Sequence, residues 1–549
     1  MRRLVALVVL MGLALVACTS AVTDTSTTTT SVETGPTTPP ETTTTVPDPC
    51  PDVFCVVYTI RPDAVWSDGR PVTAEDFAFT LALFLDPQGP DPGNPGYTLV
   101  TGSEVIDDET FLIAMSVEFA AWRTLFENVY PAHAEYDPVM PGPTSGPFTL
   151  ASWEEAITLE RNVHYTAPDG GGDVESVRFE VADGVRAMVT GLSSGRFDVI
   201  NPTPLDWVVE DVEGISGIQH SLIPGAYWEQ ISFNHSDPLL SLPWMREAIA
   251  TALDRESVLN ATVRALDPAT TSLGNTVWMH GSSHYLDHFH VQHDPTGAVE
   301  ILTGNGCVRG SDGIFVCDGI RASFIWATTV GDPDRSTQID RGIEMLRGAG
   351  IEALPWRLSP SNLFSTPILY GDYRVWQMMS FAWKASADPF LGDSMYRCSG
   401  DGPHGMGLLN VARYCNDEVD QLIAVTSQIM DPLERADVYN QADQIYLEDV
   451  AVIPLYQRPS LLAWSSLLQG PLQNPWSTDT WNIGSWSGQS VVVFALAGEP
   501  ASLTAPLPTD DAAALIMKAL YLGAFSVTPD DEFVPALVSG AEVLVRGGG

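Results

Sequence analysis

Strand-like and helix-like stretches alternate along the chain, and this alternation restricts the fold more than any other feature. The stretch CVVYTIRPDAVWSDGRPVTAEDFAFTLALFL (55–85) begins with the period-two pattern of a strand and turns at SDG. Thr73 then opens a predicted helix, and Asp76 stands three residues later, which is the spacing of a capping box. A strand, a turn and a capped helix therefore follow one another within about thirty residues.

The same alternation continues through the chain. The stretch 103–115 predicts two strands around the turn Asp107-Asp108, and 245–263 has helical spacing of its apolar residues. The stretch 417–456 predicts two helices followed by a buried strand from Ala451 to Tyr456. Interleaved elements of this kind predict an α/β fold, and 549 residues exceed one compact core, so more than one lobe is expected.

The N-terminus has the pattern of an export signal. Arg2 and Arg3 precede a 14-residue apolar run, Leu4 to Ala17, which is short for a membrane span. The run closes with LVAC (15–18), which resembles the lipobox of bacterial lipoproteins and predicts a signal peptide over 1–17 with lipidation at Cys18. The alternative is an ordinary signal peptide in which the cysteine is incidental. No later stretch reaches 18 apolar residues, so no transmembrane helix is expected.

Residues 18–49 are predicted to form a disordered tether. Residues 19–49 contain 14 threonines and five prolines and almost no large apolar side chain. Such a segment buries too little surface to offset the entropy of ordering it.

Six further cysteines form three close pairs in the sequence. An exported protein permits disulfides, and the even count with local spacing favours pairing within each pair over a zinc site, which would want shorter spacings. The predicted disulfides are Cys50–Cys55, Cys307–Cys317 and Cys398–Cys415.

The composition excludes some partners and leaves others open. The formal net charge is −43, and the chain has two lysines, Lys384 and Lys518. A chain this acidic repels phosphate, so no nucleic-acid partner is expected. The charge could favour cationic ligands, although a solvated acidic surface is the favoured explanation.

No enzyme, cofactor or metal site is expected. The sequence has neither a P-loop nor an H-E-x-x-H motif. Its one rival signal is the stretch 279–294, which holds five of the ten histidines. His284 and His288 would share one face of a helix and could bind a metal, whereas a polar surface loop is the alternative.

Six motifs, taken in order, carry a family resemblance: YTIRPDAVWSDGRPVTAEDF, TSGPFTLASW, SSGRFDVI, ISFNHSDPLLSLPWMREAIATALDRESV, AWKASADPF and VAVIPLYQRP. They resemble the solute-binding proteins of ABC importers, in the large subgroup that handles peptides, nickel chelates and related solutes. The resemblance runs from about residue 55 to 546. It implies a two-lobed periplasmic-binding-protein-like fold of type II, with one lobe from 50–235 and 456–549, the other from 236–455, and a hinge between them.

The resemblance also implies the function. Such a protein captures a small solute, here an oligopeptide by preference, and delivers it to the permease subunits of an ABC importer. It would act as a monomer in the cell envelope, held by lipid to the outer face of the cytoplasmic membrane. The alternatives are a sensory or scaffold protein of the same fold without a transporter, and a secreted hydrolase.

The binding residues come from the resemblance alone. In peptide-binding relatives the loop after the tryptophan of AWKASADP supplies an aspartate for the ligand amine. That position aligns here with Ser386 or a gap, and Asp388 is the nearest acid. The full set of candidate ligand-binding residues is Trp383, Ser386, Asp388, Thr509, Asp510, Asp511 and Tyr97.

The last sixty residues resemble the segment with which family members begin. The stretch 491–543 matches a family segment that normally precedes the YT…WSDG strand, so the chain resembles a circular permutant. The alternative is a truncated tandem copy. If the segment is used in its usual place, Val543 to Arg546 should pair antiparallel with Val56 to Ile60, and Ala495 to Leu503 should enter the lobe that contains 50–235.

Overall fold

The structure is a computed structural model that describes residues 50–166, 171–400, 402–506 and 510–546. The predicted signal peptide, the lipidation site Cys18, the tether and Thr509 lie outside these ranges. None of the helices within them combines the length and the apolar character that a membrane crossing requires.

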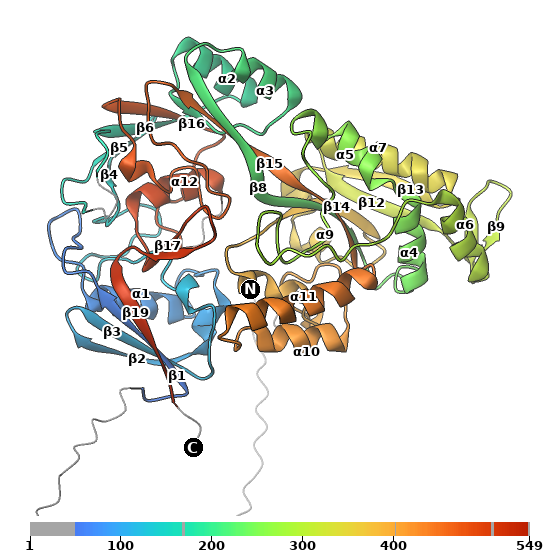
Figure 1. Cartoon of the computed structure of the whole chain (residues 1–549), viewed down its shortest axis with the longest axis horizontal. Coiled ribbons are helices and arrows are strands. Elements are labelled where there is room, and N and C mark those ends of the chain that lie inside the picture. The colour runs from blue at the N-terminus through green and yellow to red at the C-terminus, as the bar shows by residue number, and fades with distance from the viewer. Residues whose placement is uncertain (1–49, 167–170, 401, 507–509, 547–549) are drawn as a thin grey trace, which may run out of the picture. The chain divides into compact units, whose positions relative to one another are not determined.

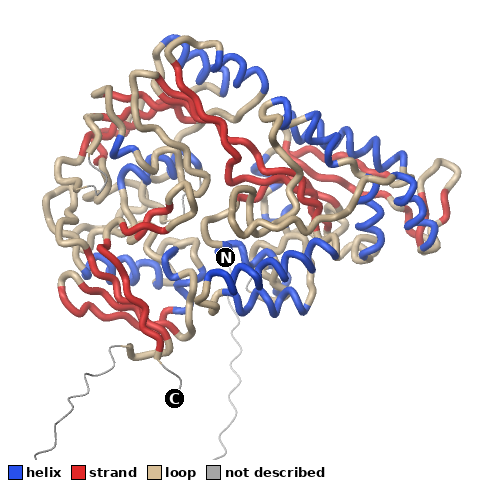
Figure 2. The backbone as a smooth tube through the Cα atoms, in the orientation of Figure 1, coloured by secondary structure: helices blue, strands red, loops and turns tan. Residues whose placement is uncertain are grey.

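A ten-stranded mixed sheet runs through the unit formed by residues 50–546 (Figures 1 and 2). Its strand order is β13 (Glu352–Leu358), β12 (Ser323–Thr329), β14 (Met378–Lys384), β8 (Ile218–Phe233), β15 (Val452–Ser465), β7 (Val199–Ile200), β16 (Val491–Leu496), β6 (Ser176–Val181), β5 (Ile157–Arg161) and β4 (Phe148–Trp153).

Three smaller sheets accompany it. One has the order β19 (Val538–Val545), β1 (Phe54–Ile60), β3 (Thr110–Met115) and β2 (Val100–Asp107). The second consists of β11 (Ile320–Arg321), β10 (Phe315–Cys317) and β9 (Val308–Arg309), and the third is the hairpin of β17 (Phe525–Val527) and β18 (Phe533–Pro535).

Helices pack against these sheets and lie between their strands in sequence. The α-helices are α1 (Ala74–Leu85), α2 (Val185–Ser194), α3 (Asp206–Glu213), α4 (Pro243–Ala252), α5 (Arg255–Ala261), α6 (Pro295–Gly304), α7 (Pro333–Gly348), α8 (Pro360–Leu363), α9 (Thr366–Leu369), α10 (Asp417–Thr426), α11 (Pro432–Glu448) and α12 (Asp511–Leu520). The 3-10 helices are η1 (Pro95–Leu99), η2 (Trp122–Thr124), η3 (Val263–Ala265), η4 (Pro389–Met395), η5 (Pro403–Gly405) and η6 (Ile483–Ser485). The predicted α/β class is confirmed.

Two large hydrophobic cores lie toward opposite ends of the long strand β15, which pairs with β8. The first core gathers Tyr58, Phe77 and Trp486, and the second gathers Trp326 and Tyr446. Strand β15 contributes Leu462 to the first core and Ile453 to the second. Because β8 and β15 pair antiparallel over most of their length, one two-stranded ribbon connects both cores. This is the arrangement expected of two lobes joined by crossing strands.

The predicted capping box forms, and its aspartate also binds two residues outside the helix. The Asp76 carboxylate accepts hydrogen bonds from the Thr73 backbone N–H at 2.8 Å and from the Trp66 indole N–H at 3.1 Å. It also accepts one from the Ala132 N–H at 2.7 Å. Asp76 is buried, so these donors satisfy its charge while they fix the WSDG turn against α1.

The structure confirms the three predicted disulfides, divides the helical stretch predicted at 245–263, and has the loop alternative at 280–294. The bonds Cys50–Cys55, Cys307–Cys317 and Cys398–Cys415 are all formed. The stretch 245–263 is two helices, α4 and α5: the extended backbone of Leu253 ends the first, and Asp254 caps the second by accepting from the Ser257 N–H. The stretch 280–294 is loop, so His284 and His288 share no helical face.

The C-terminal segment is integrated into two sheets. Strand β19 pairs antiparallel with β1, with Val543 opposite Val56 and Val538 opposite Ile60. The partner strands are those predicted, although the pairing takes in Val538–Val545 and extends to Phe54. Strand β16 lies between β7 and β6 and runs parallel to both. The segment therefore supplies an edge strand of one sheet and an internal strand of another.

Candidate functional site

A cavity of about 270 Å³ lies between the 384–388 loop on one side and η1, η2 and the C-terminal segment on the other. Its aromatic walls are Phe84, Tyr97, Trp476, Phe525 and Phe533. Sites for small ligands are typically concave and largely apolar with a few polar groups, which is what this cavity offers. A second cavity of about 40 Å³ adjoins it along Lys384, Ala385 and Ser386.

Tyr97, one of the predicted residues, is a fixed part of the wall. It is 4% exposed, and its hydroxyl accepts a hydrogen bond from the Phe126 backbone N–H at 2.7 Å. Burial raises the pKa of its phenol, so the hydroxyl stays protonated. Its ring packs edge-on against Phe84 and Phe126. Because the Tyr97 side chain is already fixed, a solute could pack against its ring with little further loss of side-chain entropy.

Ser386 and Asp388 line the cavity, but their polar atoms are engaged within the protein. The Arg435 guanidinium donates to both carboxylate oxygens of Asp388, at 2.8 and 2.7 Å. Asp388 also caps η4 by accepting from the Phe390 N–H, and the Ser386 hydroxyl donates to the Asp388 carbonyl. The nearest acid to the expected amine-binding position thus already has a cationic partner.

The remaining predicted residues lie beside the large cavity. Trp383 lines the smaller cavity and pairs with Trp228 across β14 and β8. Asp510 caps α12 by accepting from the Ala513 N–H at 2.7 Å, and Asp511 is exposed in the first turn of that helix. Asp511 is near enough to Tyr227 for its charge to help raise the tyrosine pKa, after burial, to about 12. Neither aspartate lines the large cavity, although Lys518 of the same helix does.

Several lining residues were missed by the sequence reasoning. These include Arg123, Lys384 and Lys518, which all line the large cavity. Their positions in the sequence are unrelated, so no local motif brings them together. One signal was available, because Lys384 and Lys518 are the two lysines of the whole chain.

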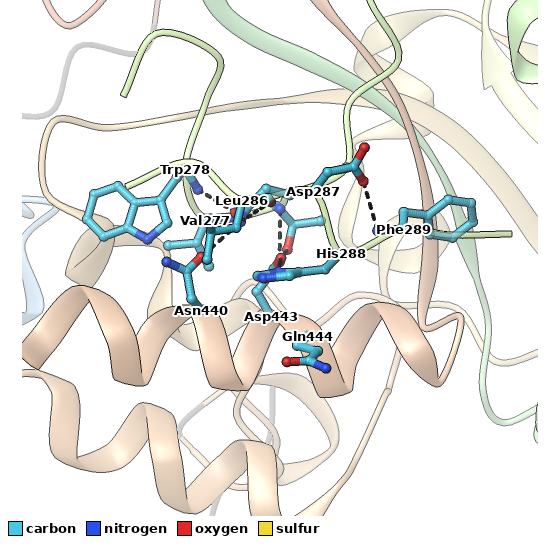
Figure 3. Close-up of polar contacts among 12 residues, drawn as sticks. Val277, Trp278, Leu286, Asp287, His288, Phe289, Asn440, Asp443 and Gln444 are labelled. Carbon is cyan, nitrogen blue, oxygen red and sulfur yellow. Dashed lines mark hydrogen bonds and ion pairs between the residues drawn. The ribbon is translucent and has the colours of Figure 1, made fainter. Parts of the chain in front are cut away.

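The histidine-rich loop follows two residues of the smaller cavity wall, and its histidines form no cluster of metal-ligand spacing among the described residues. The His288 ring nitrogen Nδ1 lies 2.7 Å from the Asp443 carboxylate of α11, and Asp443 also accepts from the Thr276 N–H (Figure 3). Thr276 and Val277 in turn line the smaller cavity. Over the described ranges, the one cluster with metal-ligand spacing is Cys398, Cys415 and Asp417, whose sulfurs are already joined in a disulfide.

Changing Asp443 is expected to release this loop. Asp443 is fully buried, so Asp443→Asn weakens the contacts to Thr276 and His288 and is predicted to lower the free energy of unfolding by about 1–3 kcal/mol. Hydrogen exchange should increase over residues 275–289. Gln444→Ala is the matched control, because Gln444 is exposed on the same helix and contacts Glu448 alone among the bonds described (Figure 3). Equal hydrogen exchange over residues 275–289 in the two variants would contradict the role of Asp443 in holding this loop.

Asp531 gives the site a pH-dependent element. It lies in the turn between β17 and β18, and burial, followed by the charge of Asp388, raises its pKa to about 7. A carboxyl whose pKa is higher in the folded chain destabilises the fold fully above that pKa, and the cost shrinks as the pH falls toward the unfolded value near 4. Asp531→Asn is therefore expected to raise the Tm over the parent at about pH 8, with a gain that fades by about pH 4.5. The same change at exposed Asp530 should give no such trend, and a pH-independent effect of Asp531→Asn would contradict the prediction.

One short stretch matches the sequence motif of a nucleophilic serine. Residues 191–195 read GLSSG, which fits the pattern G-x-S-x-G. A nucleophile elbow requires the serine at a sharp turn between a strand and a helix. Here Ser193 lies in the last turn of α2, and Ser194 donates back to the Gly191 carbonyl. The motif therefore has the geometry of an ordinary helix end.

Comparison with known proteins decides the family. The sequence model for the middle region of the bacterial extracellular solute-binding proteins, family 5, matches residues 44–402. The chain belongs to this family. Family 5 proteins are the solute-binding components of ABC importers, so the predictions of a binding protein and of no enzymatic activity are confirmed.

Individual relatives are distant but cover most of the chain. The oligopeptide-binding protein OppA of Mycobacterium tuberculosis is 25% identical over 437 residues, which is 75% of this chain and 71% of the relative. The oligopeptide-binding protein AppA of Bacillus subtilis is 23% identical over 458 residues, covering 78% of this family 5 chain and 79% of AppA.

Solved structures agree on the fold. The periplasmic EDTA-binding protein EppA superposes with a TM-score of 0.70 at 20% identity, over 79% of this chain and 84% of EppA. NikZ of Campylobacter jejuni, in complex with Ni(L-His), superposes with a TM-score of 0.67 at 18% identity, over 80% of this chain and 88% of NikZ. AppA of Bacillus subtilis, in complex with a nonapeptide, superposes with a TM-score of 0.63 at 22% identity, over 79% of this chain and 87% of AppA. The two-lobed type II fold is confirmed.

Proposed function

We propose that this family 5 protein captures a small oligopeptide in the cavity beside the 384–388 loop and delivers it to the permease of an ABC importer. The observation that carries the proposal is the cavity itself, whose aromatic walls come from residues 84–97 and 476–533 and whose opposite side is the loop after Trp383. Relatives named as oligopeptide-binding proteins support the choice of a peptide.

The proposal includes a closing motion. One lobe would combine 50–235 with 456–546, and the other would consist of 236–455, with β8 and β15 as the hinge. Contacts between the two sets of residues already exist, because the rings of Phe119 and Phe390 lie 4.9 Å apart and the Ala120 N–H donates to the Ser427 carbonyl. A solute that touches both lobes would stabilise the closed state over the open one.

The proposed location is the outer face of the cytoplasmic membrane. The sequence LVAC supports lipidation at Cys18, and the Thr/Pro-rich composition of 18–49 supports a tether to the membrane. The protein would act there as a monomer.

Retention of peptides by the full-length protein tests the proposed function. The protein is incubated with a library of tri- to pentapeptides and separated from free peptide by size exclusion, and the retained masses are measured. We expect one intact peptide per chain. Retention of no peptide, or recovery of cleaved products, would contradict the proposal.

A further inference from the structure

The cavity concentrates positive charge in a strongly acidic protein. The chain carries a formal charge of −43, yet both of its lysines line this one cavity together with Arg123. Lys384 is the last residue of β14, Lys518 lies in the last turn of α12, and Arg123 lies in η2. Three separate elements, on both sides of the cavity, therefore each contribute a cationic residue to its lining.

These cations have no carboxylate partners among the residues described. No ion pair within 4.0 Å involves Lys384, Lys518 or Arg123 in those ranges, whereas most other exposed arginines pair with an acid. Arg123 stacks on the Trp122 ring at 4.2 Å, and the Lys384 ammonium lies 5.9 Å from the Tyr227 ring centre. In both contacts the charged group itself lies over the face of an aromatic ring, which needs no carboxylate partner.

The acids that line the cavity do not balance this charge. They are Glu127 and Asp388, and the Arg435 guanidinium already holds both oxygens of Asp388. The lining thus holds three cationic residues and one carboxylate, that of Glu127, without a described ion pair. A ligand carboxylate among these side chains would be attracted to them and would accept charge-assisted hydrogen bonds.

We propose that the cavity selects small solutes by their carboxylates, through Lys384, Lys518 and Arg123. The proposal rests on the function proposed above and adds the chemical class of the solute. The cavity of about 270 Å³ is near the lower limit of small-ligand sites, which suits a short acidic peptide or a free polycarboxylate better than a long peptide. Both candidates offer the same chemistry, namely two or more carboxylates on a small frame.

Isothermal titration of the full-length protein with four probes tests the selection. The probes are the tripeptides Glu-Ala-Glu, Gln-Ala-Gln and Lys-Ala-Lys, and citrate. We expect Glu-Ala-Glu to bind at least about tenfold more tightly than its isosteric amide, and Lys-Ala-Lys to bind most weakly. Lys518→Met and Lys384→Met should each weaken Glu-Ala-Glu about tenfold, while Lys518→Arg keeps most of the affinity.

Arg347→Met is the matched control, because Arg347 is exposed on α7 outside the cavity lining and its loss should leave the affinity unchanged. Equal binding of Glu-Ala-Glu and Gln-Ala-Gln would overturn carboxylate selection and leave the peptide function standing. Binding of citrate without any tripeptide would support carboxylate selection and contradict the peptide function. If no probe binds, carboxylate selection is overturned, and peptide retention from the library decides the function separately.

Discussion

A chain that ends at Ser490 is expected to lose its cooperative unfolding transition. Removal of 491–549 takes away β16, an internal strand of the ten-stranded sheet, and leaves β6 and β7 without their shared neighbour. It also removes α12 and β19, and with them apolar side chains of the first core such as Phe494 and Ile516. The free energy lost through unpaired strand edges and an opened core is far larger than the whole free energy of unfolding of an ordinary domain.

Circular dichroism and limited proteolysis measure this effect. A chain that begins at Cys50 is the control, since it lacks only the predicted signal peptide and tether, and it should melt like the full-length protein. A chain ending at Ser490 that unfolds cooperatively at the same temperature as the full-length protein would contradict the role assigned to the segment.

We further propose that this segment occupies the place that the N-terminal segment of family members fills. The Arg546 N–H donates to the Val53 carbonyl, so the end of β19 lies beside the start of β1. A short turn can join antiparallel neighbours of this kind. A rearranged chain, with 490–546 placed ahead of Cys50 through such a turn, is expected to fold and to keep the Tm of the parent. Failure of that chain to fold would count against the permutation.

Replacing Glu229 by alanine is expected to lower the free energy of unfolding by about 3–5 kcal/mol. Glu229 lies on the long strand β8 and is fully buried. It accepts hydrogen bonds from Arg335 at 2.8 and 3.0 Å and forms an ion pair with Arg458 at 3.1 Å. Both guanidiniums are mostly buried, and they lose their shared anion in the variant. Because Glu229 sits opposite Tyr456 where β8 meets β15, the loss also affects the strands that join the two cores.

Urea unfolding measures the change, and Glu180→Ala is the matched control. Glu180 also pairs with two arginines, Arg178 and Arg196, but both of these are more than half exposed, at 51% and 57%. Solvent screens such pairs, so the control should lose no more than about 1 kcal/mol. Similar losses in the two variants would show that burial does not govern these ion pairs.

Much of the fold could be predicted because its signals are local. The capping box at Thr73 and Asp76 and the hairpin at 103–115 each depend on a few neighbouring residues, and the structure contains both. Pairing of the C-terminal strand with β1 was predictable from the family order of segments, since the sequence on its own gives no register. The conformation of the loop around His284 could not be predicted, because side chains of a distant helix, Asn440 and Asp443, hold it in place.

The charge of the site could not be predicted in the same way. Arg123, Lys384 and Lys518 come together only when β14, α12 and η2 are placed around one cavity. Asp388 was a reasonable candidate for a ligand amine, and its bidentate contact with Arg435, 47 residues away in sequence, is a tertiary feature. Burial and pairing decide which of many acidic residues remains available, and both depend on the complete fold.

Native mass spectrometry of the full-length protein, isolated with whatever solute it carries, tests the central claim most directly. Solute capture in the cavity predicts a one-to-one complex with a small carboxylate-bearing molecule that remains chemically unchanged on incubation. Ser386→Trp fills the space between the two cavities and should abolish the complex while leaving the Tm within a few degrees. A protein that carries no solute and retains none from the peptide library, or a Ser386→Trp variant that binds the same molecule as tightly as the parent, would contradict the account.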